Sequence, residues 1–476
     1  MKHAPPIIDD QIAQVLNKTF ERHEDVDLNE GILIALPKPG KPKGPPQNLR
    51  PITLLNSIRK VLSTVALNRI RSKVEKYISH SQSGFRPNRS TADVVWAHRW
   101  LAATVFNSNH VQIDITGIDM SAAFDTINRN ELLDILKDIV NDDELRIIQF
   151  LLSKTTIHVK VNGTDKKLPF TTNIGTPQGD SLSPVLFIVY LENALKETRK
   201  TEENAKPTPP KEIIYADDID FIGDSHLDLT EIENILQKHN LKVNVDKTEH
   251  TRVRRDTDDW KKTKKVGSLI DSKKDIEHRK HLSNIALTKL SNIWKRANKI
   301  RQTTRIKLYN SLVRSILLYN CGTWALTKTD EDKLDSFHRR QLRRVLGIHY
   351  PTKISNTSLY KKCAEIPLSI QILQSRWRLF GHILRRDASI PANASMSYFF
   401  SETKKRGRGR PTTTLPVTLN SDLKKVHGKS LKLTTAADLD KIRNIAEDRQ
   451  EWKTFTAEVM KTAEAARYDD HAGERL

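Results

Sequence analysis

An acidic pair inside an apolar run constrains this chain more than any other feature. The run is IIYADDIDFI, residues 213–222, in which Asp217 and Asp218 follow residues typical of a buried strand. Burying carboxylates costs several kcal/mol unless something neutralises them. Adjacent strand residues point to opposite faces, so the two acids share a site only in a tight turn between two strands. The alternative is an exposed hairpin tip, where acidic residues cost little.

A third acid, Asp119, ends another predicted strand about a hundred residues earlier. A cluster of carboxylates repels itself, and one member would take up a proton at neutral pH unless a cation joins it. Mg²⁺ prefers hard oxygen ligands, and two-metal phosphoryl transfer uses carboxylates that bridge ions about 3.5–4 Å apart. Asp119, Asp217 and Asp218 are therefore the predicted metal ligands.

The charge of the chain indicates a polyanionic partner. The sequence holds 79 Lys and Arg against 58 Asp and Glu, which gives a net charge of +21. Residues 251–350 alone carry 25 Lys and Arg against 10 Asp and Glu, so most of the excess lies in about a fifth of the length. A concentrated basic segment favours nucleic acid as the partner over an ordinary basic surface.

The two cysteines, Cys321 and Cys363, exclude a disulfide framework and a Cys/His zinc cluster. The N-terminal residues lack the apolar core of a signal peptide, and no apolar stretch approaches the ~20 residues of a membrane span. We expect a soluble intracellular protein, and a location in the nucleus is compatible with these features.

Periodicity predicts mixed α and β structure first and basic helices afterwards. Apolar and basic residues alternate at helical spacing over residues 57–77, and Leu308, Leu312 and Ile316 do so within residues 305–318. Residues 334–346 combine one apolar face with four arginines.

Several segments resemble motifs of reverse transcriptases from non-LTR (LINE-like) retrotransposons, in that family's order over roughly residues 15–275. The palm motifs are similar to DMSAAFD (119–125), GTPQGDSLSP (175–184) and YADD (215–218). The finger motifs are similar to LPKPGKPKGPPQNLRPITLLNSIRKVL (36–62) and QSGFRPNRST (82–91). Weaker likeness continues into LYNCGTWALT, FHRRQLRRVLGI, RWRLFGHILRRD and RGRGRP.

The resemblance implies an α+β right-hand polymerase core with fingers, palm and helical thumb, followed by a helical basic C-terminal region. We predict fingers and palm over 15–275, a helical thumb or connection region over 276–400, and a basic linker with a helical tail over 401–476. The strand before Asp119 departs from the family's apolar pattern, because it contains Asp114, Thr116 and Gly117.

The same resemblance implies catalytic and substrate-binding roles. Asp119, Asp217 and Asp218 would hold the metal ions, and Lys247 in VNVDKTEH would protonate the departing pyrophosphate, although a merely solvated lysine is an equal alternative. The predicted substrate-binding residues are Arg50 and Arg86 at the triphosphate, Phe124 as a gate against the 2′-hydroxyl, and Gln178 and Gly179 beside the nascent base pair. Phe124 is also compatible with a core position.

Nucleic-acid contacts are implied for two further segments. Gly267 in KKVGSLI would let a short hairpin approach the end of the primer, since glycine permits close backbone contact. A basic helix face would contact the template–primer backbone, although such faces are usually only solvated; its residues are Arg339, Arg340, Arg343 and Arg344.

The predicted function is RNA-directed DNA synthesis: deoxynucleotides are added to a primer 3′-hydroxyl with two Mg²⁺ ions, for which Mn²⁺ could substitute. RNA template, DNA primer and dNTPs are the expected partners. One alternative is a catalytically inactive, retrotransposon-derived RNA-binding scaffold, which retention of the three acids and of Phe124 disfavours. The other is an RNA-dependent RNA polymerase, which would not place a ring at Phe124. Without an endonuclease or zinc knuckle in the sequence, we expect a truncated element or one piece of a longer protein.

Overall fold

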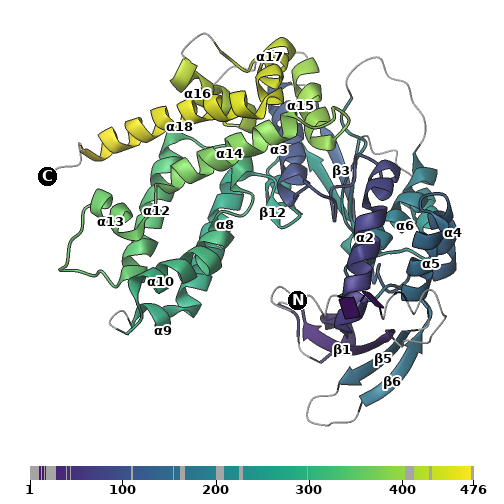
Figure 1. The fold of residues 1–476 in the computed structure, drawn as a ribbon. Helices are drawn as coiled ribbons and strands as arrows, with labels where there is room; N and C mark the ends of the chain where they lie inside the picture. Colours follow the sequence, from purple (N-terminus) through teal and green to yellow (C-terminus); the bar gives the residue numbers. More distant parts are fainter. Residues whose placement is uncertain are drawn as a thin grey trace.

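A computed structural model gives the fold of the chain (Figure 1). It describes residues 10–472 except 12, 15–16, 18–27, 39, 43, 109–110, 154, 161–166, 200–207, 224–228, 297–298, 403–411 and 428–430. The predicted basic linker at 404–411 therefore lies outside the described residues.

A four-stranded antiparallel sheet forms the palm. Its strand order is β10-β3-β8-β7, from β10 (Glu249–Val253), β3 (Ile113–Ile118), β8 (Asp218–Ile222) and β7 (Glu212–Tyr215). Ile113 and Ile115 alternate with polar residues along β3, as the pattern predicts for a sheet with distinct faces. The polar residues of this strand, which depart from the family pattern, still form a regular ladder.

Helices cover both faces of the palm sheet. Apolar residues of α3 (Thr91–Asn107) form one core with Ile113, Ile115, Ile213 and Ile222. The larger core on the other face contains α6 (Ser183–Thr198), whose side chains are buried almost all round, as expected of a central helix. This sandwich fixes the strand ends that carry the acids.

The fingers contain a second sheet of order β2-β1-β5-β6, from β1 (Glu30–Pro37), β2 (Leu49–Leu55), β5 (Thr155–Lys160) and β6 (Lys167–Thr172). Helix α2 (Ser57–Tyr77) follows β2 directly, with the bounds that the periodicity predicts. Helices α4 (Arg129–Lys137) and α5 (Asp142–Leu151) complete this part.

After a small hairpin of β11 (Lys264–Lys265) and β12 (Ser268–Leu269), the chain is helical (Figure 1). The principal helices are α8 (Ser272–Lys289), α10 (Gln302–Tyr309), α12 (Lys328–Leu346), α13 (Asn356–Cys363), α14 (Leu368–Leu384), α15 (Pro391–Ser401), α16 (Leu415–His427), α17 (Ala436–Glu447) and α18 (Arg449–Ala472). Trp96 and Trp100 of α3 share an aromatic core with α14, α15 and α18. The C-terminal helices are therefore packed against the palm.

Residues 305–317 are helical, as predicted. The residues that face the core are not the predicted row of Leu308, Leu312 and Ile316. The middle of this segment is a π-helical turn, η4 (Asn310–Arg314), and the buried residues are Ile306, Tyr309, Val313 and Leu317, whereas Leu312 is 45% exposed. No helix in the described part of the chain is long and apolar enough to cross a membrane.

Candidate active site

The acidic pair lies at the tight turn between β7 and β8, as predicted, with Asp217 in the turn and Asp218 as the first residue of β8. Tyr215 pairs with Asp218, which leaves Ala216 and Asp217 as the turn. Ala216 has a φ of 58°, a left-handed conformation that disfavours a residue with a Cβ. Because Ile118 pairs with Ile219, the next residues outward, Asp119 and Asp218, lie opposite each other at the strand ends. The fold therefore brings the three acids to one edge of the palm.

The carboxylates affect one another electrostatically. Burial, the charge of Asp217 and then those of Asp220 and Asp119 raise the pKa of Asp218 to about 6. Burial first and the charge of Asp119 second also raise the pKa of Asp217. The Lys247 ammonium lies 2.7 Å from Asp119 Oδ2, and its charge partly offsets this repulsion at Asp217, as that of Lys265 does at Asp218.

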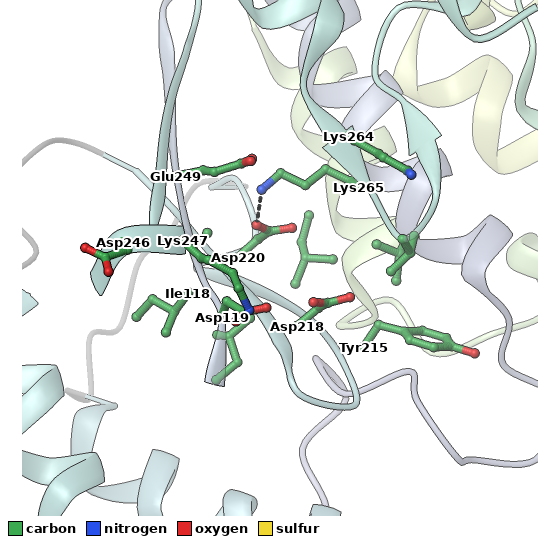
Figure 2. A pocket seen from close by; sticks show the side chains of 15 residues that line it. Ile118, Asp119, Tyr215, Asp218, Asp220, Asp246, Lys247, Glu249, Lys264 and Lys265 are labelled. Atoms are coloured by element: carbon green, nitrogen blue, oxygen red, sulfur yellow. Dashed lines mark hydrogen bonds and ion pairs between the residues drawn. The ribbon is translucent and has the colours of Figure 1, made fainter. Parts of the chain in front are cut away.

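Asp119, Asp218 and Lys247 border a cavity of about 370 Å³ (Figure 2). Asp119 and Asp218 lie on one side with Lys247, while Lys264 and Lys265 of the β11–β12 hairpin lie on the other. Asp246 and Glu249 add further acidic groups to the lining. The cavity is thus lined by both carboxylates and lysines.

The donor set suits divalent metal ions. Among the described residues, no three Asp, Glu, His or Cys side chains are already arranged to hold one. The three aspartates nevertheless provide hard oxygen donors, and the raised pKa of Asp218 reflects first its burial and then the neighbouring negative charges, which a cation would offset. Lys247 occupies part of that role on Asp119 in this structure.

Gln82 holds the acidic turn, a role that sequence reasoning missed. Its side chain accepts from Ala216 N at 2.8 Å and donates to Ala216 O at 3.2 Å, so it clamps the left-handed residue. An added Cβ on Gly84 would lie 2.2 Å from Ala216 N, so glycine is required for the finger loop to pack there. The quoted motif contained both residues, but their partner is about 130 residues away and no local pattern reveals it.

The residues predicted to contact the nucleotide lie between palm and fingers. The Phe124 ring is half-buried, stacks on Phe187 at 4.6 Å between centroids and meets the edge of Phe85 at 6.2 Å. Gly179 has a φ of 130°, and an added Cβ would lie 2.4 Å from Thr53 O. The close approach that Gly179 allows is therefore to finger strand β2, where Gln178 O accepts from Thr53 N.

The two arginines predicted at the triphosphate differ in availability. Arg50 is exposed on β2. Arg86 is buried: its guanidinium binds the Glu75 carboxylate at 2.9 Å and the carbonyls of Ser79 and Gln82. In this conformation Arg86 supports the loop that carries Gln82, and its role as a phosphate ligand stays a prediction.

The four arginines of α12 do not form a single face. Arg340 and Arg344 are exposed. Arg343 donates to Asn356 Oδ1 at 2.8 Å and so secures α13, whereas Arg339 is half-buried. All four arginines fall on one side of a helical wheel, so their spacing alone could not predict which of them are exposed and which are partly buried.

Gly267 lies in the turn of the β11–β12 hairpin, as the primer-grip prediction requires, with a φ of 84°. Its carbonyl accepts from Arg279 of α8, so thumb side chains contact the hairpin at this turn. Contact between Gly267 and a primer stays a prediction.

An antiparallel palm with acids at adjacent strand ends, flanked by fingers and a helical thumb, defines a right-hand nucleic-acid polymerase. The chain belongs to the family described as "Reverse transcriptase (RNA-dependent DNA polymerase)", whose sequence profile matches residues 36–310. The predicted family is thereby confirmed.

Relatives carry names from mobile elements. The chain is 24% identical over 392 residues to the "Probable RNA-directed DNA polymerase from transposon BS" of Drosophila melanogaster, a match that covers 76% of this chain and 42% of that protein. It is 22% identical to the "RNA-directed DNA polymerase from mobile element jockey" of the same species, with 72% and 41% covered. The chain thus spans about two fifths of the length of these relatives.

Among solved structures, the telomerase of Candida tropicalis in complex with a TWJ fragment of telomeric RNA matches with 13% identity and a TM-score of 0.42. That match covers 81% of this chain and 67% of the telomerase chain.

Proposed function

We propose that the chain is an RNA-directed DNA polymerase that adds deoxynucleotides to a primer 3′-hydroxyl. The observation that carries the proposal is the meeting of Asp119, Asp217 and Asp218 at one edge of the palm, beside a cavity that Asp119 and Asp218 line together with lysines. Its partners would be an RNA template, a DNA primer and dNTPs, and it would act on them in the nucleus.

Asp119, Asp217 and Asp218 would hold the divalent ions, two Mg²⁺ in our proposal with Mn²⁺ as a substitute. When bound, such ions supply charge neutralisation and activation of the attacking oxygen in phosphoryl transfer. The protein contributes the fixed turn: Gln82 and the β7–β8 ladder hold the acids before substrate arrives.

Lys247 would move between the Asp119 carboxylate and the phosphate of a bound substrate. Its side chain is exposed and rests on Asp119 at 2.7 Å, so it can turn towards a phosphate without losing buried packing. We assign it the proton that the departing pyrophosphate takes up. The contact with Asp119 supports this placement over that of a merely solvated lysine.

Phe124 would exclude ribonucleotides. The ring is held by Phe187 on its face and by Phe85 at its edge, so it has little freedom to withdraw from a 2′-hydroxyl. Gln178, which also hydrogen-bonds Asp125, and Gly179 would support the nascent base pair from the adjacent loop, and exposed Arg50 would reach the triphosphate.

On the nucleic-acid side, we propose that the hairpin at Gly267 and the exposed Arg340 and Arg344 contact the template–primer. Arg343 would act indirectly, by securing α13, and contact between Arg339 and the backbone stays a prediction. The domain limits of 15–275, 276–400 and 401–476 remain part of this proposal.

Primer extension on poly(rA)–oligo(dT), with dTTP and with or without Mg²⁺, tests the function. The proposal requires Mg²⁺-dependent extension. RNA binding without extension would favour the inactive scaffold, and extension with UTP in preference to dTTP would favour an RNA polymerase.

A further inference from the structure

A buried ion pair lies beneath the acidic edge and serves none of the roles above. Lys265 Nζ of β11 donates to Asp220 Oδ1 of β8 at 2.6 Å, and the two residues are 7% and 6% exposed (Figure 2). Asp220 follows Asp218 by two residues, so both side chains lie on the same side of β8. The pair therefore joins the hairpin to the strand that carries a proposed metal ligand.

The other carboxylate oxygen of Asp220 is also engaged. His98 Nε2 of α3 lies 3.1 Å from Asp220 Oδ2, and His98 Nδ1 lies 2.8 Å from Val94 O. Both ring nitrogens of His98 therefore lie close to oxygen atoms, one of Asp220 and one of the α3 backbone. Asp220 is thus held from α3 and from the hairpin at once.

Gly117 makes room for this contact. It pairs with Asp220 across the ladder, and a Cβ added to it would lie 2.6 Å from Lys265 Nζ and 2.9 Å from Asp220 Oδ1. The Lys265 side chain therefore passes over β3 at Gly117, which has no side chain to block it. This contact explains why a glycine stands in the strand before Asp119.

The thumb holds the opposite end of the same hairpin. Arg279 of α8 donates to Gly267 O and lies over the Tyr319 ring at 4.4 Å, while Tyr319 Oη donates to Val266 O at 3.0 Å. The hairpin is thus connected through its turn to the thumb and through Lys265 to β8.

We infer that Lys265 is a positioning residue, which sets the place of the β11–β12 hairpin, and with it the primer 3′ end, relative to Asp119 and Asp218. The inference rests on the proposed function. An apolar pair of similar size would fill the space, but it would not fix the hairpin in one register, because apolar packing is not directional whereas a buried ion pair is.

Lys265→Met is the main test, and Lys265→Met/Asp220→Asn is its companion, because the double variant leaves no buried unpaired charge. Three measurements compare them with the parent on the same primer–template: the single-nucleotide addition rate, the Kd values for dTTP and primer–template, and hydrogen exchange of residues 264–269. Arg376→Met is a matched control, since it removes another buried cation, 2.6 Å from Asp422, outside the pocket.

We expect both Lys265 variants to exchange faster in the hairpin and to add nucleotides ~10–100-fold more slowly, with Kd values within about twofold of the parent, since small misplacements of reacting groups have effects of this size. The double variant should recover thermal stability but not rate. Arg376→Met should lower Tm and leave hairpin exchange and rate unchanged.

Unchanged hairpin exchange in Lys265→Met would overturn the inference even in a chain that does not polymerise. Faster exchange with the parent's rate, or recovery of rate in the double variant, would overturn it as well. A parent that fails to extend primers would instead count against the proposed function.

Discussion

Gln82→Ala should disable the active site without touching any carboxylate. Gln82 is 2% exposed, and its Oε1 accepts from Ala216 N at 2.8 Å and from Gly84 N at 2.7 Å. Each buried donor left without a partner costs ~1–3 kcal/mol. Since Gln82→Ala removes the acceptor of two N–H groups, it should lower the free energy of unfolding by about 2–4 kcal/mol once water enters the space. The left-handed conformation of Ala216, which itself costs roughly 1–2 kcal/mol, then loses its support.

The catalytic effect follows from the position of that residue. Ala216 immediately precedes Asp217, so relaxation of its φ moves the metal ligands, and we expect a ~10–100-fold lower rate of dTTP addition. Ser83→Ala is the matched control, because Ser83 keeps its backbone contact with Ile214 O and should retain the parent's rate. Chemical denaturation and single-turnover extension measure the two effects. A Gln82→Ala protein that is destabilised but extends as fast as the parent would refute the clamp.

Four further outcomes follow from the site. Asp217→Asn should fold and bind RNA but fail to extend primers; extension at the parent's rate would remove Asp217 from the metal site. Because the folded pKa of Asp218, about 6, exceeds the ordinary 3.8, metal-free stability should fall as pH rises through that window, and Asp218→Asn should raise Tm at pH 7. Phe124→Val should raise the ratio of rNTP to dNTP incorporation; an unchanged ratio would assign the ring to the core alone. Arg340→Gln with Arg344→Gln should reduce the salt dependence of primer–template binding, and an unaltered log–log slope would place the contact elsewhere.

The sequence predicted those parts of the fold that depend on local patterns. The turn at Asp217, the strand ending near Asp119 and the helix over 57–77 all follow from periodicity and from the cost of burying charge. The motifs identified the family, since several occur in the family's order.

Features that depend on distant partners were not predictable in this way. On the helix near 310, two apolar rows of similar spacing compete, and only the packed thumb core selects the row that contains Tyr309 and Val313. Arg86 and Arg343 appeared available as surface cations, but Glu75 and Asn356 engage them. A single sequence shows the charge and spacing of a residue but not which distant residue it contacts in the fold.

The acids of the opening run are tolerated because different parts of the chain hold them. Gln82 from the fingers fixes the turn before Asp217, and Lys247 offsets the charge of Asp119. Lys265 from the β11–β12 hairpin neutralises Asp220, which lies two residues after Asp218 on β8. Gln82 comes from the fingers, Lys247 from the segment before β10 and Lys265 from the β11–β12 hairpin, so three separate elements support the ends of β3 and β8. The acidic edge is therefore where contacts from different parts of the chain converge.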